Sequence, residues 1–122
     1  GIDVRIGISD GTTGNRITLA WGTGTSTMSI VMVASGSSVF DGGTVGFKNF
    51  TQIQTEMATF KIKWKSGDIQ VKVNDTIVLT QADTFTMVGL DQVSLGKGYG
   101  DTGNSFEGNV QYIKVYDSAT DF

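Results

Sequence analysis

Residues 58–79, ATFKIKWKSGDIQVKVNDTIVL, constrain the fold of this chain more than any other segment. The apolar positions that alternate with polar ones are Phe60, Ile62 and Trp64 and, after the break at Ser66, Gly67 and Asp68, Ile69, Val71 and Val73. A period of two is typical of antiparallel strands with one buried face and one exposed face. Asn74 and Asp75, which tolerate positive φ, turn the chain once more. The segment therefore predicts a three-stranded antiparallel meander with one apolar face.

The polar face of this meander carries four lysines, namely Lys61, Lys63, Lys65 and Lys72. The chain has 9 basic and 12 acidic residues, so nine less these four leaves five basic residues for the rest of the chain. A concentrated basic stripe fits the uronate, sialate, sulfate or phosphate groups of an anionic glycan. The same lysines would also keep an exposed sheet face soluble, so the sequence leaves both interpretations open.

The rest of the chain also favours short strands and tight turns. Glycine accounts for 17 of the 122 residues and proline for none, whereas the helix formers leucine, alanine and glutamate are sparse. Alternating runs predict further strands at residues 2–8, 15–21, 28–34, 92–95 and 106–116. We expect one all-β domain over residues 1–122, an antiparallel β-sandwich of the jelly-roll type with little or no helix. The sequence is also compatible with a domain excised from a longer chain.

Three stretches have less regular patterns. Val39 and Phe40 indicate a short strand, whereas residues 45–54 carry aromatic or aliphatic side chains every three positions and are predicted to be irregular. In the loop over residues 81–91, Phe85 and Met87 are predicted to reach into the core. Apolar residues occupy both parities of residues 28–34, which predicts a strand that is covered on both faces.

The residue types that are missing exclude several functions. The chain has no histidine and no cysteine, which excludes Ser-His-Asp hydrolases, most zinc enzymes and a disulfide framework. Glu56 and Glu107 each stand alone and do not form the paired carboxylates of a retaining glycosidase. A net charge of −3 argues against nucleic acid as a partner, and no apolar run approaches the ~20 residues that a membrane-spanning helix needs. We therefore predict a protein that is not an enzyme and does not insert into a membrane.

Four stretches in order resemble the concanavalin A-like lectin/glucanase superfamily in its laminin G-like form. Residues 8–19, with ISDG and NRITL, resemble the pattern "sdG..nNRI.l"; residues 60–79 resemble "v.w..G.v.vyvNG..v"; residues 93–96 are similar to "l.lG"; and residues 106–119 are similar to "f.G.i..vriY..al". The resemblance implies a β-sandwich that binds carbohydrate or a receptor, like modules of bacteriophage tail fibres, tailspikes and bacterial adhesins. It also implies a location outside the cell or on the virion surface. Family members have one or two strands ahead of the position of Ile2, which leaves open a trimmed chain, a compact one, or completion by a neighbouring subunit.

Aromatic residues are the main candidates for contacts with sugar rings. Trp21, Phe60 and Trp64 share the parity of core aliphatic residues and are predicted to be buried. If Ile113 and Val115 point inward, Tyr112 and Tyr116 project outward together. Because Val110 has the same parity as these tyrosines, a β-bulge is expected near Gln111 or Tyr112. The predicted carbohydrate-binding residues are Arg16, Tyr99, Asp101, Asn104, Tyr112, Lys114 and Tyr116.

A calcium site and two other functions remain open. The resemblance implies one calcium ion at a sheet rim, for which the candidate oxygen ligands belong to Asp10, Asp41, Asp101 and Asn104. Local hydrogen bonds to the backbone are the alternative explanation of these turn residues. Exposed tyrosines also suit a structural module that forms a homo-oligomer in a fibre or adhesin. A polysaccharide-degrading enzyme with tyrosine and lysine as its acid–base pair is the second alternative.

Overall fold

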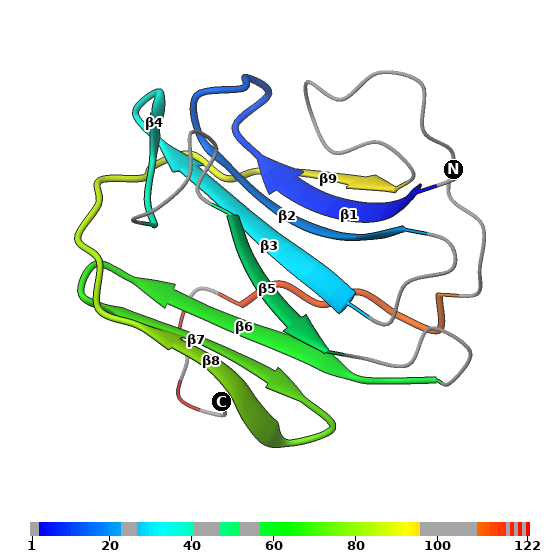
Figure 1. The fold of residues 1–122 in the computed structure, drawn as a ribbon. Coiled ribbons are helices and arrows are strands. Elements are labelled where there is room, and N and C mark those ends of the chain that lie inside the picture. The colour runs from blue at the N-terminus through cyan, green and yellow to red at the C-terminus, as the bar shows by residue number, and fades with distance from the viewer. Residues whose placement is uncertain are drawn as a thin grey trace.

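The computed structural model describes residues 3–22, 27–40, 47–51, 57–95, 110–116, 118, 120 and 122. Every regular element in this part of the chain is a β-strand, and the strands form two antiparallel sheets (Figure 1). The predicted all-β class is therefore confirmed, and the arrangement is consistent with a β-sandwich. The jelly-roll connectivity stays a prediction. No described residue belongs to a helix that is long and apolar enough to cross a membrane.

The larger sheet has six strands, β1 (Asp3–Ser9), β2 (Arg16–Gly22), β3 (Thr27–Ala34), β4 (Ser37–Ser38), β5 (Phe47–Thr51) and β9 (Gln92–Leu95). Its order is β4-β3-β2-β1-β9, and β5 also pairs with β3. Strand β4 pairs with Val33 and Ala34, whereas β5 pairs with residues 27–31. Thus β4 and β5 occupy successive parts of the same edge of β3.

The smaller sheet is the predicted meander, formed by β6 (Phe60–Lys65), β7 (Asp68–Val73) and β8 (Thr76–Gln81) in that order. Its two turns have the backbone that their residues favour, because Gly67 has a φ of 81° and Asn74 and Asp75 have φ values of 50° and 65°. A β-bulge shifts the register between β7 and β8 at Val71 and Lys72. The two-residue turn itself sets Ile77 opposite Lys72, where it is 51% exposed, and the bulge then brings Leu79 opposite Val71.

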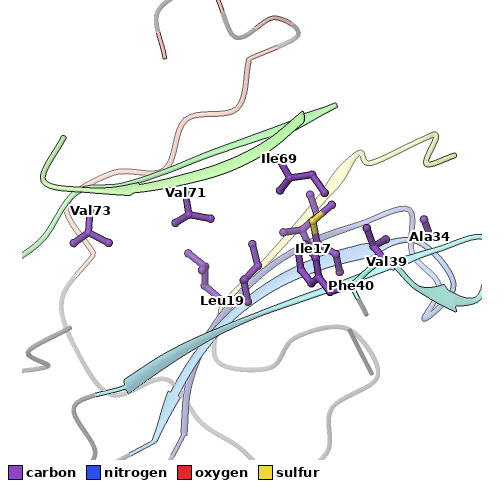
Figure 2. Packing of buried hydrophobic residues seen from close by; sticks show 10 residues of the cluster. Ile17, Leu19, Ala34, Val39, Phe40, Ile69, Val71 and Val73 are labelled. Atoms are coloured by element: carbon purple, nitrogen blue, oxygen red, sulfur yellow. The ribbon is translucent and has the colours of Figure 1, made fainter. Parts of the chain in front are cut away.

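The hydrophobic core lies between the two sheets (Figure 2). It consists of Ile17, Leu19, Ile30, Met32 and Ala34 from β2 and β3, Val39 and Phe40 after β4, and Ile69, Val71 and Val73 from β7. Phe60 and Trp64 of β6 pack against this cluster, and so do Phe85 and Met87 of the loop before β9, as predicted. The packing of alternate residues against one shared core explains why the period-two pattern is so regular in the meander.

The central strands of the larger sheet are buried on both faces. Thr18 and Val31, which are paired across β2 and β3 and face away from the core, are 2% and 6% exposed. This agrees with the apolar residues found on both parities of residues 28–34.

Two short strands differ from the sequence predictions. Val39 and Phe40 are not a strand, because the positive φ of Ser35 (50°) and Gly36 (78°) makes a tight turn directly after β3, and pairing resumes already at β4. The stretch predicted to be irregular contains β5, since its residues 47–51 pair with the free edge of β3. Spacing by three within one segment could not reveal that edge, which belongs to a different part of the chain.

The predicted closing strand is also wrong for the residues that are described. Residues 110–116 form no strand, so the bulge expected near Gln111 or Tyr112 does not exist. Ile113 and Val115 are 38% and 48% exposed and do not point into the core. Alternation marks a segment that can form a strand, but a strand also needs a partner edge in register.

Candidate functional site

The outer face of the smaller sheet carries the four lysines predicted from the meander. Because Phe60, Ile62 and Trp64 face the core, Lys61, Lys63 and Lys65 of β6 face away from it. Lys61 lies directly opposite Lys72 of β7. Like charges in a direct cross-strand pair repel each other and destabilise the sheet. The fold therefore holds positive charges close together on one exposed surface.

Two of these lysines have acidic partners at the ends of the strands. Lys61 Nζ lies 2.9 Å from Asp75 Oδ1, and Lys63 Nζ lies 2.9 Å from Asp68 Oδ2. The hydrogen bond with Asp75 raises the pKa of Lys61, and the same bond lowers the pKa of Asp75. Lys65 is exposed and forms no ion pair within the described part of the chain. The aspartates keep the lysine ammonium groups in place at the margin of the face without neutralising all of them.

Phe122 lies on the same face. The Lys72 ammonium group donates a hydrogen bond to the main-chain oxygen of Phe122. Lys72 Nζ is also 4.3 Å and Lys63 Nζ 5.4 Å from the centroid of the Phe122 ring, within the range of cation–π interactions. Sequence reasoning did not find this contact, because 50 residues separate Lys72 from Phe122 and no local pattern connects them.

Residues 110–116 bring two of the predicted tyrosines to this surface. In Figure 2 the segment, in faint orange, runs along the side of the smaller sheet that faces away from the core. The hydrogen bond with Asp75 is the largest cause of the raised pKa of Lys61, and electrostatic interactions with Tyr112 and Tyr116 raise this pKa further. Their side chains are 56% and 68% exposed, and Lys114 Nζ lies 5.1 Å from the Tyr112 ring centroid. We call the set Lys61, Lys63, Lys65, Lys72, Tyr112, Lys114 and Tyr116 the lysine–tyrosine surface.

The loop between β1 and β2, which carries the candidate calcium ligand Asp10, is held by its own hydrogen bonds. Asp10 Oδ1 accepts hydrogen bonds from the backbone N and the hydroxyl of Thr12, at 2.8 and 2.6 Å, and Asp10 Oδ2 accepts one from Asn15 Nδ2 at 2.8 Å. These bonds, led by the one from the Thr12 hydroxyl, lower the pKa of Asp10. Asn15 Oδ1 in turn accepts a hydrogen bond from the Ser35 backbone N at 3.0 Å, which links this loop to the β3–β4 turn. Local structure thus accounts for Asp10 without a bound ion.

The remaining predicted residues do not join the lysine–tyrosine surface. Arg16 pairs with Val33 on the face of the larger sheet that points away from the core, so the two sheets separate it from the tyrosines. Tyr99, Asp101 and Asn104, and the candidate calcium ligand Asp41, lie outside the described residues. The described residues contain no group of three or more acidic, histidine or cysteine side chains that could hold a metal ion. Calcium binding therefore stays a prediction.

Comparison with known proteins identifies no relative of this chain. No family model matches the chain, and neither a curated protein sequence nor a solved structure matches it. A functional assignment for this chain therefore rests on the chemistry of the lysine–tyrosine surface.

Proposed function

We propose that this chain is a non-catalytic module that binds an anionic polysaccharide through the lysine–tyrosine surface. The observation that supports this most strongly is that residues 110–116, which carry two exposed tyrosines, approach the side of the smaller sheet on which the lysines lie, although they are far from them in sequence. Lysines supply the charge for carboxylate or sulfate groups, and tyrosine rings supply flat apolar faces for sugar rings.

The cross-strand pair of Lys61 and Lys72 favours an anion as the ligand. Asp75 pairs with Lys61 and offsets part of the repulsion between these like charges, and a carboxylate or sulfate on the same face would gain the attraction of both ammonium groups. Lys65 adds a charge that no acidic side chain of the described residues neutralises. A neutral polysaccharide could accept hydrogen bonds from these three ammonium groups but would gain no charge–charge attraction.

The resemblance to laminin G-like members of the concanavalin A-like superfamily points in the same direction. In our proposal the module belongs to an adhesin, a phage tail fibre or a tailspike, has the jelly-roll form of the sandwich, and meets its polysaccharide or receptor outside the cell. Fold resemblance alone does not determine a ligand, so the charge of the surface is what selects the anionic class.

Titration calorimetry with polygalacturonate and with neutral dextran tests this function. We expect binding of polygalacturonate only, weakening as NaCl is raised from about 50 to 300 mM because salt screens exposed charges. Lys65→Ala should weaken binding about two- to fivefold, the range for one exposed ion pair. Tyr116→Ala should also weaken it, and Val88→Ala, which truncates a loop side chain that is 70% exposed, is the matched control. The proposal is refuted if polygalacturonate does not bind at low salt, or if neither Lys65→Ala nor Tyr116→Ala changes its Kd.

A structural role in a homo-oligomer is the second candidate, because residues 110–116 expose several apolar side chains. These are Val110, Tyr112, Ile113, Val115 and Tyr116, which are 37–68% exposed. Light scattering at increasing protein concentration distinguishes the two functions. A stable dimer or trimer in which Tyr116→Ala shifts the mass to that of a monomer would favour this second role.

A further inference from the structure

Phe122 differs from the rest of the final segment in how closely it is held. All the other described residues beyond position 109, at 110–116, 118 and 120, are exposed, whereas Phe122 is half-buried against the smaller sheet. The ammonium groups of Lys63 and Lys72 form cation–π contacts with the Phe122 ring. Lys72 also donates a hydrogen bond to the main-chain oxygen of Phe122. Phe122 is thus anchored on the positive charges of the lysine–tyrosine surface.

The same ammonium groups are those that an anionic polysaccharide would need. The main-chain oxygen of Phe122 occupies a hydrogen-bonding position of Lys72 where a carboxylate or sulfate oxygen would bind, and the ring covers Lys63 and Lys72. We propose that Phe122 is a displaceable internal competitor that closes the centre of the lysine–tyrosine surface until an anionic polysaccharide replaces it. This inference rests on the proposed function, because it concerns the regulation of the same site.

The contacts of Phe122 are of a kind that a polyanion can replace. A neutral ring attracts an ammonium group through its quadrupole, which is weaker than the attraction of a full negative charge at the same distance. Among the described residues, Ser118 and Thr120 are exposed, so local release of Phe122 does not require the sheets to unfold. Lys61 and Lys65 do not contact Phe122 and give the polysaccharide an initial site of attachment. Binding would then spread to Lys63 and Lys72 as Phe122 leaves.

A competitor of this kind lowers the apparent affinity by the fraction of molecules in which the site is open. If Phe122 closes the surface in about 70–90% of molecules, its removal should tighten binding about three- to tenfold. The variant Phe122→Ala removes the ring and its cation–π contacts with Lys63 and Lys72, and it keeps all surface lysines and the main-chain oxygen that accepts the Lys72 hydrogen bond. Val88→Ala removes an exposed apolar side chain from the loop before β9 and serves as the control.

Two measurements on wild type, Phe122→Ala and Val88→Ala test the inference. The first, without ligand, is the acetylation rate of each lysine followed by mass spectrometry, with circular dichroism as the check on folding. We expect Lys63, which Phe122 contacts through its ring, and Lys72 to react several-fold faster in Phe122→Ala, and Lys65 to react at the wild-type rate in all three proteins. The second is the Kd for polygalacturonate, which should fall about three- to tenfold in Phe122→Ala alone.

The outcomes separate this inference from the proposed function. Unchanged acetylation rates of both Lys63 and Lys72 in Phe122→Ala mean that the Phe122 ring does not cover them and overturn the inference. Faster acetylation with an unchanged Kd means that Phe122 covers Lys72 but does not compete, which also overturns the inference while the proposed function stands. If neither wild type nor Phe122→Ala binds polygalacturonate, the proposed function fails, and the inference about competition fails with it.

Discussion

Replacing Ile69 with alanine tests whether the smaller sheet packs on the larger one as described. Ile69 lies on β7 and is 0% exposed, within the core cluster that both sheets build. Truncation removes three carbon groups, which at about 0.8 kcal/mol each amount to about 2.4 kcal/mol of lost burial. Residues of both sheets surround the site and cannot collapse fully into the space, so a cavity adds to this cost. We expect Ile69→Ala to lower the free energy of unfolding by about 3–4 kcal/mol.

The matched control is Ile77→Ala on the neighbouring strand of the same sheet. Because Ile77 is 51% exposed on the outer face, its truncation leaves no cavity and should cost about 1 kcal/mol or less. Urea unfolding followed by fluorescence or circular dichroism gives both values, provided that the slope m is the same for all proteins. Losses of equal size in the two variants would refute the packing of β7 against the larger sheet. A larger loss at Ile77 would place the apolar face of the meander on the other side.

Two further predictions concern the turn after β1. Gly11 has a φ of 86°, and a Cβ atom there would lie 2.6 Å from Gln92 Nε2, whereas at Gly67, with a φ of 81°, nothing lies within 4 Å. The end of the Gln92 side chain is flexible and can move away from a new Cβ atom, so in urea unfolding we expect Gly11→Ala and Gly67→Ala each to cost about 1–2 kcal/mol through backbone strain. A variant as stable as wild type at either position would contradict the positive φ there. Folding lowers the pKa of Asp10, so its carboxylate stabilises the protein above the ordinary value of 3.8, and this contribution is lost as the pH falls through the folded-state pKa. The stability advantage of wild type over Asp10→Asn should thus be constant above about pH 5 and shrink in more acidic solution, and a pH-independent difference would be inconsistent with the hydrogen bonds to Asp10.

The parts of the fold that the sequence predicts well are those with local causes. The meander was predictable because alternation within each strand and the turn residues Gly67, Asn74 and Asp75 all lie within residues 58–79. Strand β5 was not, because its existence depends on the free edge of β3, and Phe47 and Phe50 show only a spacing by three. The β-bulge at Val71 and Lys72 was also missed, since it arises from the pairing of two strands and not from either one alone.

The candidate site divides in the same way. The shared face of Lys61, Lys63 and Lys65 follows from parity within β6, which the sequence contains. The parity of β6 does not predict the cation–π contact of Lys72 with Phe122 or the approach of residues 110–116 to Lys61, because these contacts join distant parts of the chain. Arg16 was predicted to share a site with the tyrosines, but β2 carries it on the far side of the larger sheet.

The sequence alone thus determines an all-β chain, the two faces of each strand in the meander, and the concentration of positive charge on one of them. The tertiary structure decides which edge each strand pairs with, that both faces of β2 are covered, and which distant residues meet the lysines. The reason is that a repeat of two residues is a property of one segment and its own backbone geometry. Strand pairing and the burial of a strand's two faces depend instead on contacts between segments that are far apart in the chain, so the sequence of one segment does not identify the strand with which it pairs.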